Sequence, residues 1–195
     1  MRIISGTARG RKLCPPPLHN KSIRPTSDRA REALFSILGN RVHGARVLDL
    51  FAGTGALGLE ALSRSADLVV FVDNSPQALQ LVKKNIDICS TGLTEKCTIR
   101  VLRHDLTRNL PISKLLPYTL SGFDIIFVDP PYSRNISLSI LDFLSESSLL
   151  ARNGLLIIEE RHNVDLPRNL PTLSCIDKRT YGETVFYFYQ VPSTS

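Results

Sequence analysis

Short apolar runs alternate with amphipathic stretches from residue 46 onward. The runs are rich in Val, Ile, Leu and Phe, and their length and composition predict buried strands. They occupy residues 46–50, 68–72, 98–102, 123–128 and 155–159. Helical patterns lie between them and begin near Ala56, at Ser75-Pro76 and near Ser137. This order is typical of βαβ units, so we predict a doubly wound α/β fold with a mostly parallel sheet.

The two ends of the chain depart from this alternation. A helix is expected over residues 28–38, where apolar side chains recur at helical spacing before Gly39, and these are Ala30, Ala33, Leu34, Ile37 and Leu38. Near the other end, residues 173–179 and 184–190 flank Tyr181-Gly182-Glu183 and predict a hairpin. The hairpin brings the expected sheet to seven strands, of which the last is antiparallel.

Positive charge is concentrated at the start of the chain. The formal net charge is +6, and residues 1–31 hold eight of the 24 Lys and Arg side chains but only one acidic residue. The basic ones are Arg2, Arg9, Arg11, Lys12, Lys21, Arg24, Arg29 and Arg31. Such a cluster can contact phosphates and bind a polyanion by releasing its counterions, although a merely solvated basic arm has the same composition. We therefore divide the chain into a basic extension over residues 1–25 and a main domain over residues 26–195.

Several function classes are not favoured. The four cysteines and four histidines are scattered without metal-ligand spacing, so we expect reduced thiols, a cytoplasmic protein and no metal. No apolar run approaches the roughly 20 residues that span a bilayer, and the first residues do not resemble a secretory signal. A single domain of this length is expected to act as a monomer.

A glycine turn follows the first strand of the predicted sheet. Gly53, Gly55 and Gly58 satisfy the GxGxxG pattern, and Asp73 follows at the distance expected of a ribose-binding acid, so a nicotinamide-dependent oxidoreductase is an alternative. However, Asp49 precedes the turn, and its carboxylate would repel a pyrophosphate at the helix N-terminus. S-adenosylmethionine carries an ammonium and a sulfonium in place of phosphate, so an acid at this position favours it. A turn that serves only strand-to-helix packing is the simplest alternative.

Further acids follow the next two strands. Asp73 can accept both ribose hydroxyls, and Asp105 can accept the adenine amino group, because ligands of open α/β sheets bind beyond the carboxyl ends of the strands. The cofactor residues expected from this pattern are Asp49, Phe51, Gly53, Gly55, Asp73 and Asp105.

The sequence Asp129-Pro130-Pro131-Tyr132 follows the fourth strand. The Asp129 carboxylate and the Pro130 carbonyl can accept the two hydrogens of an exocyclic base amine and aim its lone pair at a methyl donor. Tyr132 would stack on a base that has left its helix. The pattern thus predicts an amine methyltransferase that acts on nucleic acid, while a proline-stiffened loop without chemistry is the alternative.

Taken together, these residues resemble the bacterial RsmD-type methyltransferases, which modify guanine N2 in 16S ribosomal RNA. The blocks that carry the resemblance are residues 2–6, 9–13, 24–29, 31–35, 49–64, 129–132 and 181–184, nearly the whole length of the chain. Ser5 replaces a glycine that is common in the first block. The glycine turn and Asp-Pro-Pro-Tyr are shared with many amine methyltransferases, whereas the N-terminal blocks are more particular.

The resemblance implies S-adenosylmethionine as cofactor, a class I methyltransferase fold and an assembled or nearly assembled small subunit as the preferred substrate. It also implies that the basic N-terminal segment docks on the RNA, through Arg9, Arg11, Lys12 and Arg24. A DNA or RNA adenine-N6 methyltransferase and a non-catalytic RNA-binding protein with the same fold remain alternatives. The DNA enzyme lacks support because little chain is left after residue 132 for a target-recognition domain.

Overall fold

The computed structural model describes residues 1–16, 28–90, 97–118, 121–131 and 134–192. Arg24, Tyr132 and the expected boundary between residues 25 and 26 lie outside these ranges. In chain order the helices are α1 (Asp28–Leu38), the 3-10 turn η1 (Gly39–Val42), α2 (Ala56–Ser63), α3 (Pro76–Ser90), α4 (Ile112–Leu115), the 3-10 turn η2 (Leu116–Tyr118) and α5 (Arg134–Ser145). The strands are β1 (Arg46–Leu50), β2 (Leu68–Asp73), β3 (Thr98–Arg103), β4 (Phe123–Val128), β5 (Leu150–Arg161), β6 (Ser174–Tyr181) and β7 (Thr184–Gln190).

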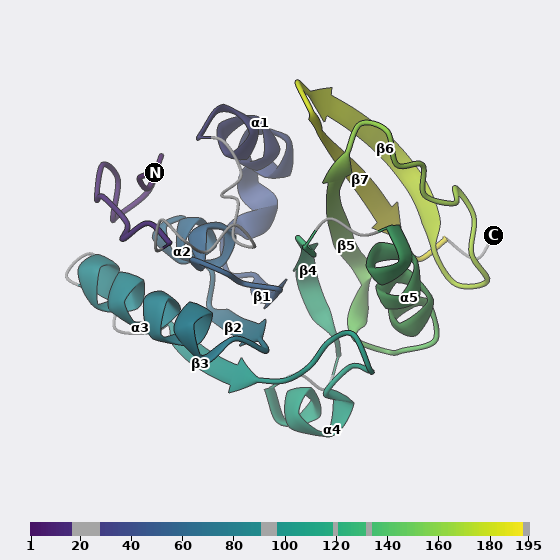
Figure 1. Ribbon diagram of the computed structural model, residues 1–195, viewed down its shortest axis with the longest axis horizontal. Coiled ribbons are helices and arrows are strands. Elements are labelled where there is room, and N and C mark those ends of the chain that lie inside the picture. Colours follow the sequence, from purple (N-terminus) through teal and green to yellow (C-terminus); the bar gives the residue numbers. More distant parts are fainter. Residues whose placement is uncertain (17–27, 91–96, 119–120, 132–133, 193–195) are drawn as a thin grey trace.

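All seven strands form one sheet, in the order β3-β2-β1-β4-β5-β7-β6 (Figure 1). The first five are parallel, and β7 pairs antiparallel with both β5 and β6. The predicted doubly wound sheet with a terminal antiparallel hairpin is therefore confirmed. The order reverses between β1 and β4, and the crevice at such a switch point is where ligands of this architecture bind.

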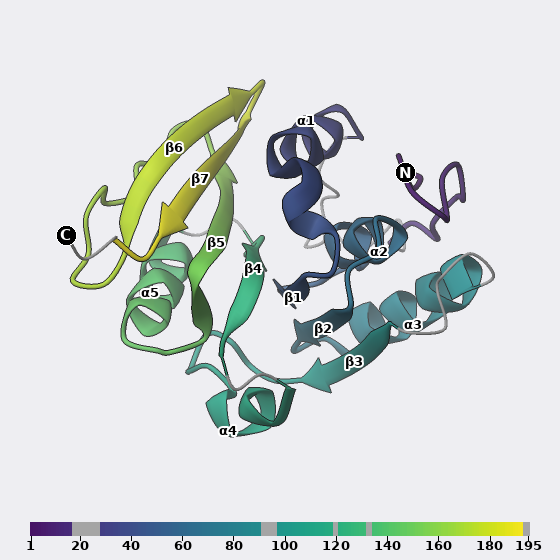
Figure 2. The same cartoon turned by 180° about the vertical axis from the view of Figure 1, so that it is seen from behind.

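Helices cover both faces of the sheet, as Figures 1 and 2 show from opposite sides. α1, α2 and α3 pack on one face, where Leu34, Leu59 and Val82 join Phe71 and Phe127 in one core cluster. α4 and α5 pack on the other face, which carries a second cluster of buried side chains. β1, β2 and β4 lie between these two layers of helices, which explains why apolar residues dominate their sequences.

The face that α1 turns to the core differs from the expected one. Ile37 is 41% exposed, whereas Arg31 and Phe35 are fully buried. Phe35 packs against the Phe127 ring at 5.8 Å between centroids, and the Arg64 guanidinium lies over it at 4.9 Å. Arg31 donates to the backbone carbonyl of Arg2 and to Asp28 at 3.1 Å. The buried face of α1 is therefore shifted from the expected one toward Phe127, Arg64 and Arg2, which lie outside the helix.

Element boundaries differ mainly around β5. This strand begins at Leu150 rather than at residue 155, because the polar stretch Arg152-Asn153-Gly154 stays extended beside β4. The pairing register shifts between Phe123 and Ile125, so the pairing of β4 with β5 is irregular there. α5 begins at Arg134, before the expected start near Ser137, and α4 was not expected. None of the helices within the described ranges is long and apolar enough to cross a membrane.

Residues 1–16 fold back on the main domain. An antiparallel bridge joins Arg2 to Lys12, and Ile3 and Leu13 are buried in the same cluster as α1 and α2. The basic segment, by which we mean residues 1–14, thus contributes apolar side chains to the core and polar ones to the surface.

Candidate active site

The carboxyl ends of β1, β2 and β4 bring three of the expected acids to one edge of the sheet. Leu50 of β1 pairs with Val72 of β2 and with Val128 of β4, so Asp73 and Asp129 each follow a residue that is level with it. The Asp129 N–H also donates to the Leu50 carbonyl at 3.4 Å. This register places Asp49, Asp73 and Asp129 around the start of the glycine turn.

The turn has a backbone that few residues adopt. Gly53 and Gly55 have φ of 55° and 76°, and Phe51 has φ of 59°, which is unusual for a residue with a side chain. A Cβ added at Gly58 would lie 2.3 Å from Phe71 Cε1, so α2 can approach β2 only with glycine there. The glycines therefore serve both a tight turn and close helix-to-sheet packing.

Asp49 carries a buried carboxyl beside the glycine turn. Its side chain is 2% exposed, and among the described residues its hydrogen bond comes from the Gly58 N–H at 3.0 Å. Burial raises the pKa of the Asp49 carboxyl to about 8, the Gly58 N–H opposes this, and the nearby Asp73 charge adds to it. A carboxyl in this state gains most from a cationic ligand, which would stabilise its charged form.

Asp73 holds the turn from the neighbouring strand. Its Oδ2 accepts the Gly53 N–H at 2.9 Å and its Oδ1 accepts the Ser75 N–H at 2.8 Å. Both oxygens keep a lone pair for another donor, which is what two vicinal hydroxyls require.

An open groove of about 670 Å³ adjoins Asp73 at the ends of β2 and β3. Its lining brings Asp105 together with the residues that follow Asp73, and it consists of Asn74, Ser75, Gln77, Arg103, His104 and Asp105. Asp105 accepts the Thr107 hydroxyl at 2.6 Å and pairs with Arg108 at 3.2 Å. The Thr107 hydroxyl and N–H lower the pKa of Asp105, so this acid stays an acceptor.

Asp129 is partly buried, and Pro130 beside it is buried. Burial raises the pKa of Asp129 well above the usual value, and the charges of Glu159, Asp49 and Glu160 raise it further. Glu159 and Glu160 lie at the carboxyl end of β5, only 3% and 1% exposed, and Glu160 accepts the Ser137 hydroxyl. These two acids were not singled out from the sequence, although they too follow an apolar run in a parallel strand.

The expected substrate-binding residues lie on the basic segment. Arg9 and Lys12 are exposed, and Arg9 lines a small cleft of about 260 Å³ with Asp28 and Glu32 of α1. Arg11 is half-buried, and its Nη1 donates to the carbonyl of Ile88 at 2.5 Å. The structure therefore places the three basic residues on a segment that other elements hold.

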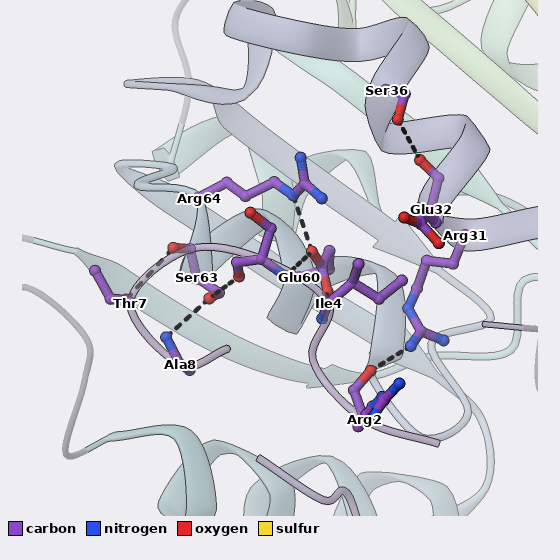
Figure 3. Close-up of polar contacts among 11 residues, drawn as sticks. Arg2, Ile4, Thr7, Ala8, Arg31, Glu32, Ser36, Glu60, Ser63 and Arg64 are labelled. Carbon is purple, nitrogen blue, oxygen red and sulfur yellow. Dashed lines mark hydrogen bonds and ion pairs between the residues drawn. The ribbon is translucent and has the colours of Figure 1, made fainter. Parts of the chain in front are cut away.

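Polar side chains that the sequence reasoning missed fasten this segment. Glu60 is fully buried on α2 and accepts the N–H groups of Ile4 at 2.7 Å and Ser5 at 3.0 Å (Figure 3). Ser63, also buried on α2, accepts the Ala8 N–H at 2.9 Å. The signal was present, since a glutamate and a serine interrupt an otherwise apolar helix. Within the described ranges no group of His, Cys, Asp and Glu could hold a metal ion, and the four cysteines are unpaired.

The chain is similar to known proteins in both sequence and structure. Residues 1–190 match the family model described as conserved hypothetical protein 95. The YlbH protein of Bacillus subtilis is 37% identical over 190 residues, which covers 97% of this chain and 98% of that protein. Ribosomal RNA small subunit methyltransferase D of Haemophilus influenzae is 35% identical over 192 residues and covers 97% and 93%. The solved structure of a hypothetical protein from Thermus thermophilus has a TM-score of 0.74 and 33% identity and covers 98% and 99% of the two chains.

Proposed function

The chain belongs to the family described as conserved hypothetical protein 95, and we propose that it transfers a methyl group from S-adenosylmethionine to N2 of a guanine in 16S ribosomal RNA. The name of the Haemophilus influenzae relative supports ribosomal RNA of the small subunit as the substrate. The single observation that carries the proposal is the edge of the sheet, where the buried Asp49 carboxyl lies beside the glycine turn and Asp129 follows β4.

The residues of this edge fit the proposed cofactor. Asp49 takes the cationic end, the backbone around Gly53 and Gly55 allows the amino-acid moiety close approach, and Asp73 accepts the ribose hydroxyls. Asp105 accepts the adenine amino group, within the groove that it lines. Phe51, which has a positive φ at the start of the turn, is assigned to the cofactor site with them. When bound, S-adenosylmethionine supplies an electrophilic methyl group on a positively charged sulfur.

The reacting amine is positioned by Asp129 and Pro130. The Asp129 carboxylate and the Pro130 carbonyl accept hydrogen bonds from the two N–H groups of the amine, which turns the nitrogen lone pair toward the methyl carbon. The N–C bond forms as the C–S bond breaks, and the product nitrogen loses one proton. In its carboxylate form Asp129 can receive that proton, and its raised pKa makes this form a stronger base than an exposed aspartate. Tyr132 is proposed to stack on the base.

Docking is assigned to the basic extension. Arg9, Arg11, Lys12 and Arg24 contact phosphates, while the domain of residues 26–195 carries the chemistry. We further propose that the protein acts as a monomer, in the cytoplasm, on an assembled or nearly assembled small subunit; the hydrogen bonds that hold residues 4–14 to α2 and α3 support docking on a structured partner.

The test is transfer of labelled methyl to unmodified small subunits, bare 16S RNA and duplex DNA, followed by nucleoside analysis. Label in N2-methylguanosine, mainly from subunits, is the expected result. Label in N6-methyladenosine would move the reaction to adenine, and the absence of label despite cofactor binding would favour a non-catalytic RNA-binding protein.

A further inference from the structure

Asn85 connects the basic segment to the glycine turn. It lies on α3 and is fully buried. Its Oδ1 accepts the Cys14 N–H at 2.7 Å, at the end of the basic segment, and its Nδ2 donates to the Thr54 carbonyl at 2.9 Å. Thr54 stands between Gly53 and Gly55, so one amide group bonds both the basic segment and the glycine turn.

The partners of Asn85 fix which way its amide faces. An N–H donor lies against Oδ1, and carbonyl oxygens lie against Nδ2, that of Thr54 at 2.9 Å and that of Cys14 at 3.4 Å. A flipped amide would set donor against donor and acceptor against acceptor. A second, weaker contact runs in parallel, because the Thr54 hydroxyl lies 3.8 Å from the Met1 sulfur. Met1 at one end of the basic segment therefore contacts Thr54 directly, and Cys14 at the other end is linked to Thr54 through Asn85.

The rest of the segment is too firmly held to absorb a movement of Cys14. Glu60 and Ser63 fasten its first half to α2, as Figure 3 shows. A Cβ added at Gly6, where φ is 81°, would meet the Ser63 carbonyl at 1.7 Å, so the backbone fits closely there. α2, which begins directly after the glycine turn, therefore also binds the first half of the segment through residues near its own C-terminal end. Asn85 adds a hydrogen-bonded link between the end of the segment and the turn.

We propose that Asn85 is a positioning residue that couples the glycine turn to the basic segment, so that a ligand in the turn orders the segment and nucleic acid on the segment favours the ligand. This inference rests on the proposed function for the identity of both ligands. Reciprocity follows from linkage: if order in the segment favours the ligand-binding form of the turn, binding in the turn favours order in the segment by the same factor. Arg9 and Lys12 are then presented best when the cofactor is in place.

The test uses hydrogen exchange of the whole protein with and without S-adenosylhomocysteine. The amides to follow are those of Ile3, Gly10 and Leu13, whose hydrogen bonds lie inside the segment. In the unaltered protein, the ligand should slow their exchange by about tenfold, within the usual range of coupling between sites. Exchange that is unchanged although the ligand binds would overturn the coupling and leave the proposed function standing. A protein that does not bind S-adenosylhomocysteine at all would overturn both.

Asn85→Asp removes the amide donor that faces the turn. The substitution keeps an acceptor for the Cys14 N–H but sets an oxygen against the Thr54 carbonyl, and against the more distant Cys14 carbonyl, in place of a donor. We expect affinity for S-adenosylhomocysteine to fall about tenfold, the cost of one unsatisfied buried polar group, and the ligand-dependent slowing in the segment to disappear. The KM for unmodified small subunits should rise with it, while kcat at saturating substrates changes little.

Cys89→Ala is the matched control. Cys89 is fully buried on the same helix, one turn further on, and its loss leaves both contacts of Asn85 in place. The control should keep ligand affinity and the slowing in the segment. If Cys89→Ala reproduces the effects of Asn85→Asp, the effect is one of helix stability and the proposed coupling is wrong.

Discussion

Replacing Asp49 by Asn should change how stability depends on pH. The folded protein holds a proton on this carboxyl up to a pKa of about 8, whereas an exposed aspartate releases it near pH 4. Between these values the folded state binds more protons than the unfolded state, so this group makes the free energy of unfolding fall as pH rises. The variant has no proton to lose at this position and lacks the decline.

The size of the effect follows from the shift. Each pH unit in this window is worth about 1.4 kcal/mol, so the difference in unfolding free energy between variant and wild type should grow by on the order of 4 kcal/mol from pH 5 to pH 8. Above pH 8 the difference should level off. Asn also keeps an acceptor for the Gly58 N–H, which limits other losses.

Urea unfolding of both proteins at several pH values measures this directly. Subtracting the two curves removes the contributions of groups that titrate alike in both proteins. Parallel curves from pH 5 to pH 8 would refute the reasoning, since they would mean that Asp49 is already charged in the folded protein.

The proton on Asp49 should also make cofactor binding depend on pH. If a cation stabilises the charged form of Asp49, binding at pH 7 must expel nearly one proton, and affinity should rise about tenfold per unit from pH 6 to 8. Calorimetry of S-adenosylmethionine in two buffers of different ionisation enthalpy counts this proton. The Asn variant should release none and bind weakly at every pH.

Three other variants test single assignments. Asp129→Ala should lower kcat on the order of 10² to 10³-fold while cofactor affinity stays within about twofold; near-normal turnover would remove Asp129 from the reacting end. Asp73→Ala should weaken cofactor affinity by about tenfold or more, since it loses ligand contacts as well as the Gly53 N–H; unchanged affinity in a binding titration would contradict this. Replacing both Arg9 and Lys12 by Ala should raise the KM for subunits and flatten its logarithmic salt dependence by about 1.4 in slope, and an unaltered slope would show that neither side chain neutralises a phosphate.

The fold was predictable because its strands are buried on both faces. β1 and β4 read as short runs dominated by apolar residues, and their observed limits equal the expected ones. The acids of the site were predictable for a related reason, since parallel strands end at a common edge. Asp49, Asp73 and Asp129 could be placed there without coordinates.

Other features depend on contacts that no local pattern contains. Arg152-Asn153-Gly154 has the composition of a turn, yet it lies within β5, between the pairs that Leu150 and Leu155 form with β4. Ile37 fits the apolar spacing of α1, but Phe35 and Arg31 find partners on β4 and the basic segment and take the buried positions. Glu60 and Asn85 bond backbone groups that lie more than 50 residues away in the chain. Periodicity cannot reveal such partners, because it describes one element at a time.

The proposed reaction needs positive charge to attract nucleic acid and negative charge at the site of methyl transfer, and the fold separates the two kinds of charge. Asp49, Asp129, Glu159 and Glu160 gather near one edge of the sheet, where they favour a cation and repel phosphates. Arg9 and Lys12 stand on a segment that Glu60 and Asn85 fasten to helices on one face of that sheet. A flexible basic tail would attract nucleic acid equally well but would hold it at no fixed place. In the proposed complex, fastening the cations to α2 and α3 would fix where the polyanion lies relative to Asp129, at the cost that the glycine turn and the basic segment could no longer change independently.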